Sequence, residues 1–238
     1  MSGIVKYVLF DGVHHQKLKP LTLTRPVADL RIGIFTIQEK WSLALNSKVA
    51  VRTKDYLRKK FNSHLNSAKI GISASIFPSL DFINALDSIE ENTIVMKSGK
   101  VLAISPLPEE NDELDSKLSS YRTVQYTGEI QSVEKPMDIF ILNALEIDRD
   151  LNFIQKENTL SNNYGTGNLF IGDDIYIEDG AIINGATLNS NDGPIYVSKN
   201  AEVMEGSNLR GPLVIMENSV IKMGSKIYGP TTIGPSCK

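Results

Sequence analysis

The last third of the chain, from Phe170 to Lys238, repeats with a period of six residues. This period fits neither one face of a helix nor a simple alternating strand, and it is typical of a solenoid built from short strands. Aliphatic side chains occupy the repeated position in two phased runs. The first run is Ile171, Ile177 and Ile183, and the second is Val197, Val203, Leu209, Ile215, Ile221, Ile227 and Ile233.

A second position of the repeat holds small side chains. Four residues after most of the aliphatic side chains comes a small one, and the exceptions are Ile175 and Leu213. The small residues are Ala181, Thr187, Ala201, Ser207, Ser219, Ser225, Thr231 and Cys237. Together the two positions predict a hexapeptide β-helix, in which each hexad forms one flat side of a triangular coil. The aliphatic residue points inward, and the small residue fits at the corner.

The phased runs argue against the alternative, an ordinary β-sandwich with coincidental spacing. The interval from Ile183 to Val197 is longer than two hexads by two residues, so we expect a loop at 189–194 to project from that coil.

Composition excludes several classes of protein. The chain has 238 residues, a net charge of −3 and one cysteine, Cys237, which fits a reducing cytoplasm. No apolar run is long enough for a membrane span, and residues 1–10 do not resemble a signal peptide. Neither part of the chain has the basic excess that nucleic-acid binding requires. We therefore expect a cytoplasmic protein that binds neither nucleic acid nor a membrane.

The region before the repeats alternates strands with helices, which predicts an α/β unit with a largely parallel sheet. The predicted strands are 4–10, 49–51, 70–72 and 93–96, and the predicted helices are 36–45, 55–61, 80–89 and 138–145. Thr36 is the expected N-cap of its helix, with Glu39 three residues later.

The stretch 160–167, rich in Asn, Ser and Gly, is the clearest linker. We therefore expect an α/β domain over 1–160, a linker over 161–168 and a β-helix over 169–238. The chain stops within a repeat, and solenoids normally carry a cap, so we expect further coils beyond Lys238.

Three stretches before the repeats carry a family resemblance. Residues 17–22 (KLKPLT) follow the first strand and a glycine-containing turn, residues 25–34 read RPVADLRIGI, and residues 133–136 read VEKP. With the C-terminal hexapeptide repeats, they resemble the sugar-1-phosphate nucleotidyltransferases. The chain is similar to N-acetylglucosamine-1-phosphate uridyltransferase and its relatives, and more so to a bacterial branch of sugar nucleotidyltransferases.

The resemblance implies that a sugar phosphate oxygen attacks the α-phosphate of a nucleoside triphosphate and expels pyrophosphate. Such catalysis rests on positioning and on neutralisation of phosphate charge by backbone N–H groups, cationic side chains and Mg²⁺. The roles that the resemblance implies are catalysis for Lys17, nucleotide binding for Gly12, Lys19 and Arg25, and sugar-phosphate binding for Glu134 and Lys135.

The chain departs from the family pattern at several positions. The bulky run 13–16 (VHHQ) replaces small loop residues, and Pro26-Val27 replaces a Pro-Lys pair. Lys17 replaces an arginine, which keeps the charge but loses the bidentate fork. The resemblance implies Mg²⁺ as a cofactor, yet residues 97–100 read KSGK where the family has its metal-binding aspartate. We interpret a lysine of this stretch as an electrostatic substitute for the ion, and no metal ligand is predicted.

The three histidines offer little further chemistry. His14 and His15 are adjacent in a loop, and no Cys or Asp stands at ligand spacing, so we predict no metal site there. His64 follows a helix in a polar stretch and is expected to be exposed. No histidine follows it, so the repeats as given contain no histidine base for acyl transfer.

The sequence therefore predicts an α/β Rossmann-like nucleotidyltransferase domain followed by a left-handed parallel β-helix, a hexapeptide-repeat solenoid. The expected partner is a nucleotide or nucleotide sugar, and the resemblance implies a homotrimer assembled through the β-helix. Two alternatives remain open. One is a catalytically silent sugar-nucleotide-binding or scaffold protein, and the other is an acyltransferase whose active site lies in further C-terminal coils.

Overall fold

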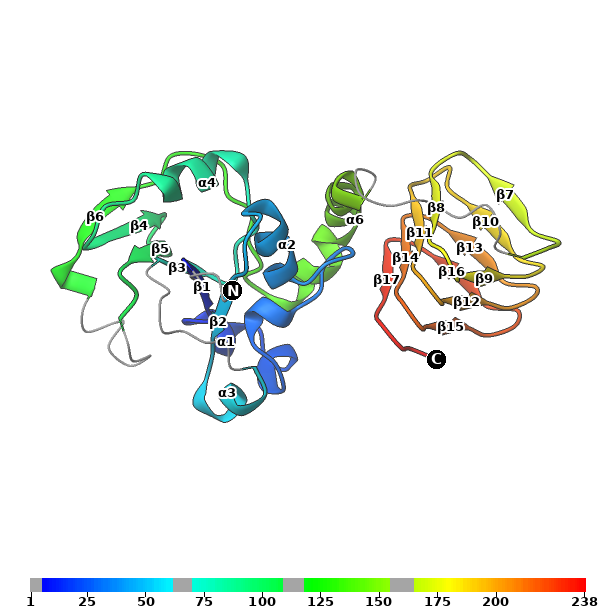
Figure 1. Cartoon of the computed structure of the whole chain (residues 1–238), viewed down its shortest axis with the longest axis horizontal. Helices are drawn as coiled ribbons and strands as arrows, with labels where there is room; N and C mark the ends of the chain where they lie inside the picture. Colours follow the sequence, from blue (N-terminus) through cyan, green and yellow to red (C-terminus); the bar gives the residue numbers. More distant parts are fainter. Residues whose placement is uncertain (1–5, 62–69, 109–117, 155–164) are drawn as a thin grey trace. The chain divides into compact units, whose positions relative to one another are not determined.

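The computed structural model describes residues 6–61, 70–108, 118–154 and 165–238 (Figure 1). His64 and residues 161–164 of the expected linker lie outside these ranges. No helix within them is long and apolar enough to cross a membrane.

The chain divides into two compact units, each described by itself below. The first comprises residues 1–30 and 36–138, and the second comprises 31–35 and 139–238. The second unit includes most of helix α6 (Pro136–Ile154), because Ile147, Leu151 and Ile154 of this helix pack on the side of the solenoid. The domain boundaries given above stay a prediction.

A mixed sheet forms the centre of the first unit. Among the described residues its strand order is β2-β1-β3-β5-β4-β6, and β5 runs antiparallel to both of its neighbours while every other pair is parallel. The strands are β1 (Tyr7–Phe10), β2 (Ala50–Arg52), β3 (Ile70–Ser73), β4 (Thr93–Lys97), β5 (Lys100–Ser105) and β6 (Arg122–Gln125).

Strands β1 to β4 correspond to the four predicted strands, whereas β5 and β6 have no counterpart in the sequence prediction. All four side chains of β6 are exposed at the edge of the sheet, so the strand carries no alternating apolar pattern that could reveal it. β5 forms a tight hairpin with β4, and this pairing reverses one strand within an otherwise parallel sheet.

The described helices are α1 (His14–Lys17), α2 (Ile37–Ala44), α3 (Asp55–Phe61), α4 (Leu80–Asp87) and α6, with short 3₁₀ turns at Leu21–Leu23, Val27–Asp29 and Leu118–Ser120. Helices α2, α3 and α4 follow the sequence prediction closely, whereas α6 is longer than predicted and α1 forms where a loop is expected around His14 and His15. The predicted capping box of α2 is confirmed, because the Glu39 backbone N–H donates to the Thr36 hydroxyl (3.2 Å) and the Thr36 N–H donates to the Glu39 carboxylate (2.6 Å).

The described repeats form stacked parallel strands, as expected for a β-helix-like solenoid (Figure 1). Each strand pairs with the equivalent strand of the next coil, which gives three sheets of order β16-β13-β10-β7, β17-β14-β11-β8 and β15-β12-β9. The strands are β7 (Leu169–Ile171), β8 (Ile175–Ile177), β9 (Ile182–Ile183), β10 (Thr187–Asn189), β11 (Ile195–Val197), β12 (Glu202–Val203), β13 (Asn208–Arg210), β14 (Leu213–Ile215), β15 (Val220–Ile221), β16 (Lys226–Tyr228) and β17 (Thr231–Ile233).

The core of the solenoid differs from the predicted phase at two places. Phe170 packs against the core in place of Ile171, and it pairs in register with Leu188 of the next coil. Leu188 is fully buried and supplies the inward residue between Ile183 and Val197. The long interval therefore holds a side of five residues, from Ile183 to Leu188, followed by a side of nine residues that contains an insertion.

Small residues occupy the corners of the solenoid. Ala181, Ala201, Ser207 and Ser219 are buried immediately before a strand begins. The Ser207 hydroxyl donates to the carbonyl of Lys222 (3.1 Å), so a corner can satisfy its polar group within the next coil. This agrees with the role predicted for the small position.

The second unit also holds residues 31–35, which a polar network fixes in place. The backbone N–H groups of Ile34 and Phe35 donate to the Asp150 carboxylate of α6 (2.8 and 3.1 Å), and the Gly33 N–H donates to the Asn143 side-chain oxygen (2.8 Å). The Thr232 hydroxyl donates to the Gly33 carbonyl (3.0 Å). Gly33 has φ +75°, and an added Cβ would lie 2.6 Å from the Asp150 carboxylate, so this position requires glycine.

Candidate functional site

The candidate site lies at the switch point of the sheet in the first unit. The chain passes from β1 to β2 on one side and then to β3 on the other, so the segments after β1 and β3 diverge and leave a crevice. A pocket of about 130 Å³ occupies this place. His14 lines it after β1, Ser75 after β3, Lys97 and Lys100 at the turn between β4 and β5, and Glu134 before α6.

Gly12 turns the chain from β1 into α1. Its φ is +50°, a left-handed conformation that favours glycine, and an added Cβ would lie 3.4 Å from the Phe10 ring. The His14 backbone N–H closes the turn by donating to the Asp11 carbonyl (3.1 Å). Gly12 therefore sets the direction in which His14 leaves the strand.

The side chain of Asp11 anchors this turn from behind. It accepts hydrogen bonds from the Val27 backbone N–H (2.9 Å), the Thr53 hydroxyl (2.5 Å) and His15 Nδ1 (3.1 Å). Burial raises the pKa of Asp11, and these donors offset part of that increase. His15 Nε2 lies 2.9 Å from the Tyr56 hydroxyl, so the imidazole accepts from tyrosine when it donates to Asp11.

Glu134 stands at the centre of the pocket. Its carboxylate accepts hydrogen bonds from Lys100 Nζ (2.9 Å) and the Ser132 hydroxyl (2.9 Å), and it lies 3.2 Å from His14 Nε2 and 3.8 Å from Lys17 Nζ. The adjacent backbone is fixed as well, because the N–H groups of Glu134 and Lys135 both donate to the carboxylate of Asp138 at the start of α6 (2.8 Å each). Two ammonium groups and one imidazole thus converge on a single carboxylate.

The surroundings shift the pKa values of this pair. Burial alone would raise the pKa of Glu134, but hydrogen bonds from Lys100 and Ser132 and the nearby His14 hold it below its ordinary value. Burial lowers the pKa of His14, and the attraction of Glu134 compensates only in part. At neutral pH the pocket therefore contains an ionised carboxylate beside a neutral imidazole.

A tight hairpin turn brings the two pocket lysines together. Ser98 and Gly99 have φ +50° and +76°, which are the conformations of a two-residue turn with both central residues left-handed. Lys97 and Lys100 pair directly across this turn. The Lys97 ammonium donates to the Gly128 carbonyl, and Lys100 reaches Glu134. The stretch that lacks the expected aspartate thus supplies positive charge to the pocket.

The other predicted site residues differ in how closely they approach the pocket. Lys17 is half-exposed at the end of α1 and faces Glu134. Lys19 and Lys135 are exposed, and Arg25 pairs with Asp29 (3.7 Å) one turn further along. Of the predicted site residues only Glu134 lines the pocket itself. The roles given above to the predicted site residues stay predictions.

His14, Ser132 and Lys100 contact Glu134 in the pocket, and the sequence analysis assigns none of the three a binding role. The family pattern has small residues at 13–16 and a metal-binding aspartate at 97–100, so it does not predict a histidine or a lysine in the pocket, and Lys100 lies 34 residues before Glu134. Only the cationic character of residues 97–100 points to the site from the sequence. Their convergence depends on the pairing of β4 with β5, which has no counterpart in the prediction.

Comparison with known families agrees with the motif resemblance. A family model described as sugar nucleotidyl transferase matches residues 7–159, which is more than half of the chain. The chain belongs to the sugar nucleotidyl transferase family. A search of curated proteins gives no match.

The pocket of this sugar nucleotidyl transferase family member does not fit a magnesium ion held by the protein. Within the described ranges no three His, Cys, Asp or Glu side chains gather at a place that could hold a metal. Glu134 is the one carboxylate among the described pocket residues, and it already faces Lys100. A divalent cation there would meet ammonium groups at close range, and we assign no step of the reaction to a protein-bound metal.

The lowered pKa of His14 predicts how stability depends on pH. The unfolded chain protonates this imidazole near its ordinary pKa of 6.5, whereas the folded chain does so only at lower pH. The resulting stability is present above pH 6.5 and is lost as pH falls through the folded pKa. We expect His14→Gln to reduce the loss of unfolding free energy between pH 7.5 and pH 5.5, measured by urea denaturation at both pH values.

A comparison of the two proteins isolates this contribution. The pKa of Asp11 is raised, so its contribution to stability has the opposite sign, but it is present in the wild type and in the variant. An equal loss of stability in wild type and His14→Gln would contradict the assignment.

Proposed function

We propose that the chain transfers a nucleotidyl group to a sugar 1-phosphate, and that the pocket around Glu134 binds the reacting phosphate and sugar groups. The observation that supports this most strongly is the convergence of Lys17, Lys100 and His14 on one carboxylate at the switch point of the sheet. This place in an open α/β sheet is where ligands generally bind.

In the proposed reaction an oxygen of the sugar phosphate attacks the α-phosphorus of a nucleoside triphosphate. A P–O bond forms there, the bond to the β-phosphate oxygen breaks, and pyrophosphate leaves with the electron pair. The chain would position the sugar phosphate and the nucleoside triphosphate and reduce the repulsion between their negative charges. Lys17 and Lys100 supply positive charge for this purpose, with Lys17 as the proposed catalytic cation.

Glu134 and Ser132 are proposed to hydrogen-bond sugar hydroxyls. The carboxylate stays ionised at neutral pH because its pKa is lowered, so it can accept hydrogen bonds from a sugar. Lys135 follows directly and is proposed to approach the sugar phosphate from the rim. The pocket volume of about 130 Å³ is below the 300–1,000 Å³ typical of small-molecule sites, so it fits part of a substrate and not a whole nucleotide.

The nucleotide is proposed to lie along the segment after β1. Gly12 would allow close approach of the backbone, and Lys19 and Arg25 would face the phosphates from outside the pocket. Because the pocket does not fit a protein-held metal, we propose that Mg²⁺ enters bound to the triphosphate, as part of the substrate.

Three finer features of the fold belong to the same proposal. The α/β unit is proposed to be Rossmann-like, the solenoid to be a left-handed hexapeptide-repeat helix, and the chain to assemble as a trimer through it. Exposed apolar side chains on the solenoid, such as Ile182 (50% exposed) and Met223 (69% exposed), support association through this part.

One observation favours a second candidate function, a silent sugar-nucleotide-binding protein. Lys100 and Glu134 neutralise each other within the pocket, and the described residues offer no metal-binding carboxylate group. Such a pocket can bind a phosphorylated sugar without promoting transfer.

A pyrophosphate-release assay tests the two candidates. The purified chain is mixed with UTP or dTTP, a hexose 1-phosphate and Mg²⁺, and binding of each nucleotide and of UDP-N-acetylglucosamine is measured in parallel by isothermal titration. We expect release of pyrophosphate that depends on the sugar phosphate. Binding of the nucleotide sugar without any release would favour the silent binder, and neither binding nor release would contradict both.

A further inference from the structure

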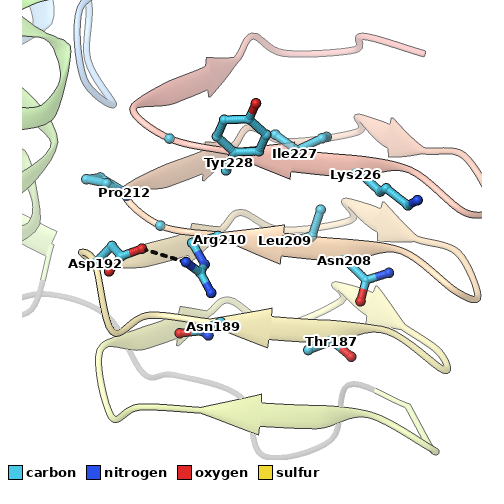
Figure 2. Close-up of a pocket in the computed structure, with 12 residues that line it drawn as sticks. Thr187, Asn189, Asp192, Asn208, Leu209, Arg210, Pro212, Lys226, Ile227 and Tyr228 are labelled. Carbon is cyan, nitrogen blue, oxygen red and sulfur yellow. Dashed lines mark hydrogen bonds and ion pairs between the residues drawn. The ribbon is translucent and has the colours of Figure 1, made fainter.

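A groove in the second unit lies on one flat face of the solenoid. It has a volume of about 660 Å³, within the range typical of small-molecule sites. Figure 2 shows its side chains standing on β10, β13 and β16. Nothing in the proposed transfer reaction uses this face.

The register of the sheet arranges these side chains in two columns. Thr187, Asn208 and Lys226 form one column, because each pairs with the next across neighbouring strands. Asn189, Arg210 and Tyr228 form the other in the same way. Neighbouring strands lie about 4.8 Å apart, so several of these polar groups can reach one small molecule.

An insertion builds one wall of the groove. Leu188 and Val197 are nine residues apart on successive sides of their coil, whereas the equivalent Leu209 and Ile215 of the next coil are six apart. The three extra residues form the turn that carries Asp192, as the sequence predicts for 189–194. The Asp192 carboxylate lies 3.1 Å from an Arg210 guanidinium nitrogen and orients it over the sheet (Figure 2).

The groove presents an unneutralised positive charge and an open aromatic ring. Asp192 offsets the charge of Arg210, but Lys226 forms no ion pair with any described residue. Tyr228 is 76% exposed, which is unusual for a large ring on a regular strand. The Asn189 side-chain oxygen accepts from the Asn191 backbone N–H, which leaves its NH₂ group for a ligand. The Asn208 NH₂ group donates to the Gly206 carbonyl, which leaves its side-chain oxygen for a ligand.

These features argue against larger partners. An added peptide strand has no place on this face, because β13 already pairs with β10 and with β16. Charged and amide side chains occupy the middle of the patch, whereas cores of protein interfaces are poor in charge. Nucleic acid is disfavoured because residues 165–238 carry eight acidic and five basic side chains.

We propose that this groove binds an anionic saccharide, a sugar that carries one phosphate or carboxylate. The apolar face of a sugar ring would lie on the Tyr228 ring, and the side-chain amides of Asn189 and Asn208 and the N–H donors of Arg210 would bind its hydroxyls. Lys226 would bind the anionic group. This site is separate from the pocket around Glu134 and does not rest on the proposed transfer reaction.

The test uses the full chain with Lys100→Ala, which weakens anion binding at the pocket of the first unit. Glucose 1-phosphate, glucuronate, glucose and inorganic phosphate are titrated by calorimetry. We expect one site for glucose 1-phosphate or glucuronate, and the stronger of the two identifies the anionic group. Adding Lys226→Ala or Tyr228→Ala should weaken binding at least tenfold, whereas Tyr228→Phe and the control Lys222→Ala, on an exposed lysine outside the groove, should leave it unchanged.

Several outcomes would overturn the proposal. Absence of saccharide binding to the Lys100→Ala chain, or binding that Lys226→Ala and Tyr228→Ala leave unchanged, would exclude this groove. Equal affinity for inorganic phosphate would reduce it to an anion site without sugar recognition. Light scattering of the same variants covers the remaining case, because a change of oligomeric state in Tyr228→Ala would identify the face as a contact between copies of the chain.

Discussion

Replacing Asp150 with alanine is expected to destabilise the second unit by about 2–4 kcal/mol. The carboxylate is 2% exposed and accepts hydrogen bonds from the backbone N–H groups of Ile34 and Phe35. Alanine leaves the buried Ile34 donor and the part-buried Phe35 donor without their acceptor, and an unpaired buried donor costs about 1–3 kcal/mol. Urea denaturation followed by circular dichroism measures the effect as a lower midpoint with an unchanged slope.

The same helix provides a matched control. Asp148 is exposed on α6, two residues away, so Asp148→Ala changes the same charge without removing a buried acceptor. We expect this control to shift the unfolding free energy by less than about 0.5 kcal/mol. Asp150→Asn keeps one acceptor oxygen and should fall between the two. Similar midpoints for Asp150→Ala and Asp148→Ala would show that residues 31–35 are held by something other than this carboxylate.

The network around Asp150 also illustrates what a sequence can and cannot reveal. The apolar face of α6 is periodic, so a helix is predicted there, although only over 138–145. The helix continues to Ile154 because Ile147, Leu151 and Ile154 pack against the side of the solenoid. That Asp150 accepts hydrogen bonds from a segment more than 100 residues earlier leaves no trace in local pattern.

The repeats are the opposite case, because each inward side chain is set by a local period. The inward side chains that this period predicts for the solenoid are therefore correct except at Ile171. The phase fails at Phe170, where two large apolar residues are adjacent and the pattern alone cannot choose which one points inward. It fails again at Leu188, because this inward residue follows Ile183 by five residues and the three-residue insertion after it breaks the period a second time.

The candidate site is predicted in part from the sequence. Family resemblance leads to Glu134 and Lys17, and the structure brings the two side chains within 3.8 Å. Lys100 is visible in the sequence only as a positive charge where an aspartate is expected. Its place beside Glu134 follows from the β4–β5 hairpin, whose reversed strand the alternating pattern does not predict.

Replacing Lys100 with alanine is expected to lower kcat/KM of the proposed transfer by about 100-fold. Removal of one preorganised charge or donor from a site that stabilises a charged transition state typically costs this much or more. Lys100 is the nearest cation to Glu134, with Nζ 2.9 Å from the carboxylate, and it lies on a rigid two-residue turn. Pyrophosphate release at several substrate concentrations separates the change in kcat from the change in KM.

A measurement of the stability of the Lys100→Ala variant distinguishes a loss of activity from a loss of folding. The Lys100 side chain is 46% exposed, and partly exposed ion pairs contribute about 0–1 kcal/mol, so Lys100→Ala should remain folded. Lys100→Arg keeps the charge and should recover most of the activity, whereas Lys48→Ala removes an exposed lysine elsewhere in the same unit and should have no effect. Full activity in a folded Lys100→Ala protein would contradict a role for this lysine at the reacting phosphates. The convergence of cations on Glu134 would then be explained as a structural ion pair.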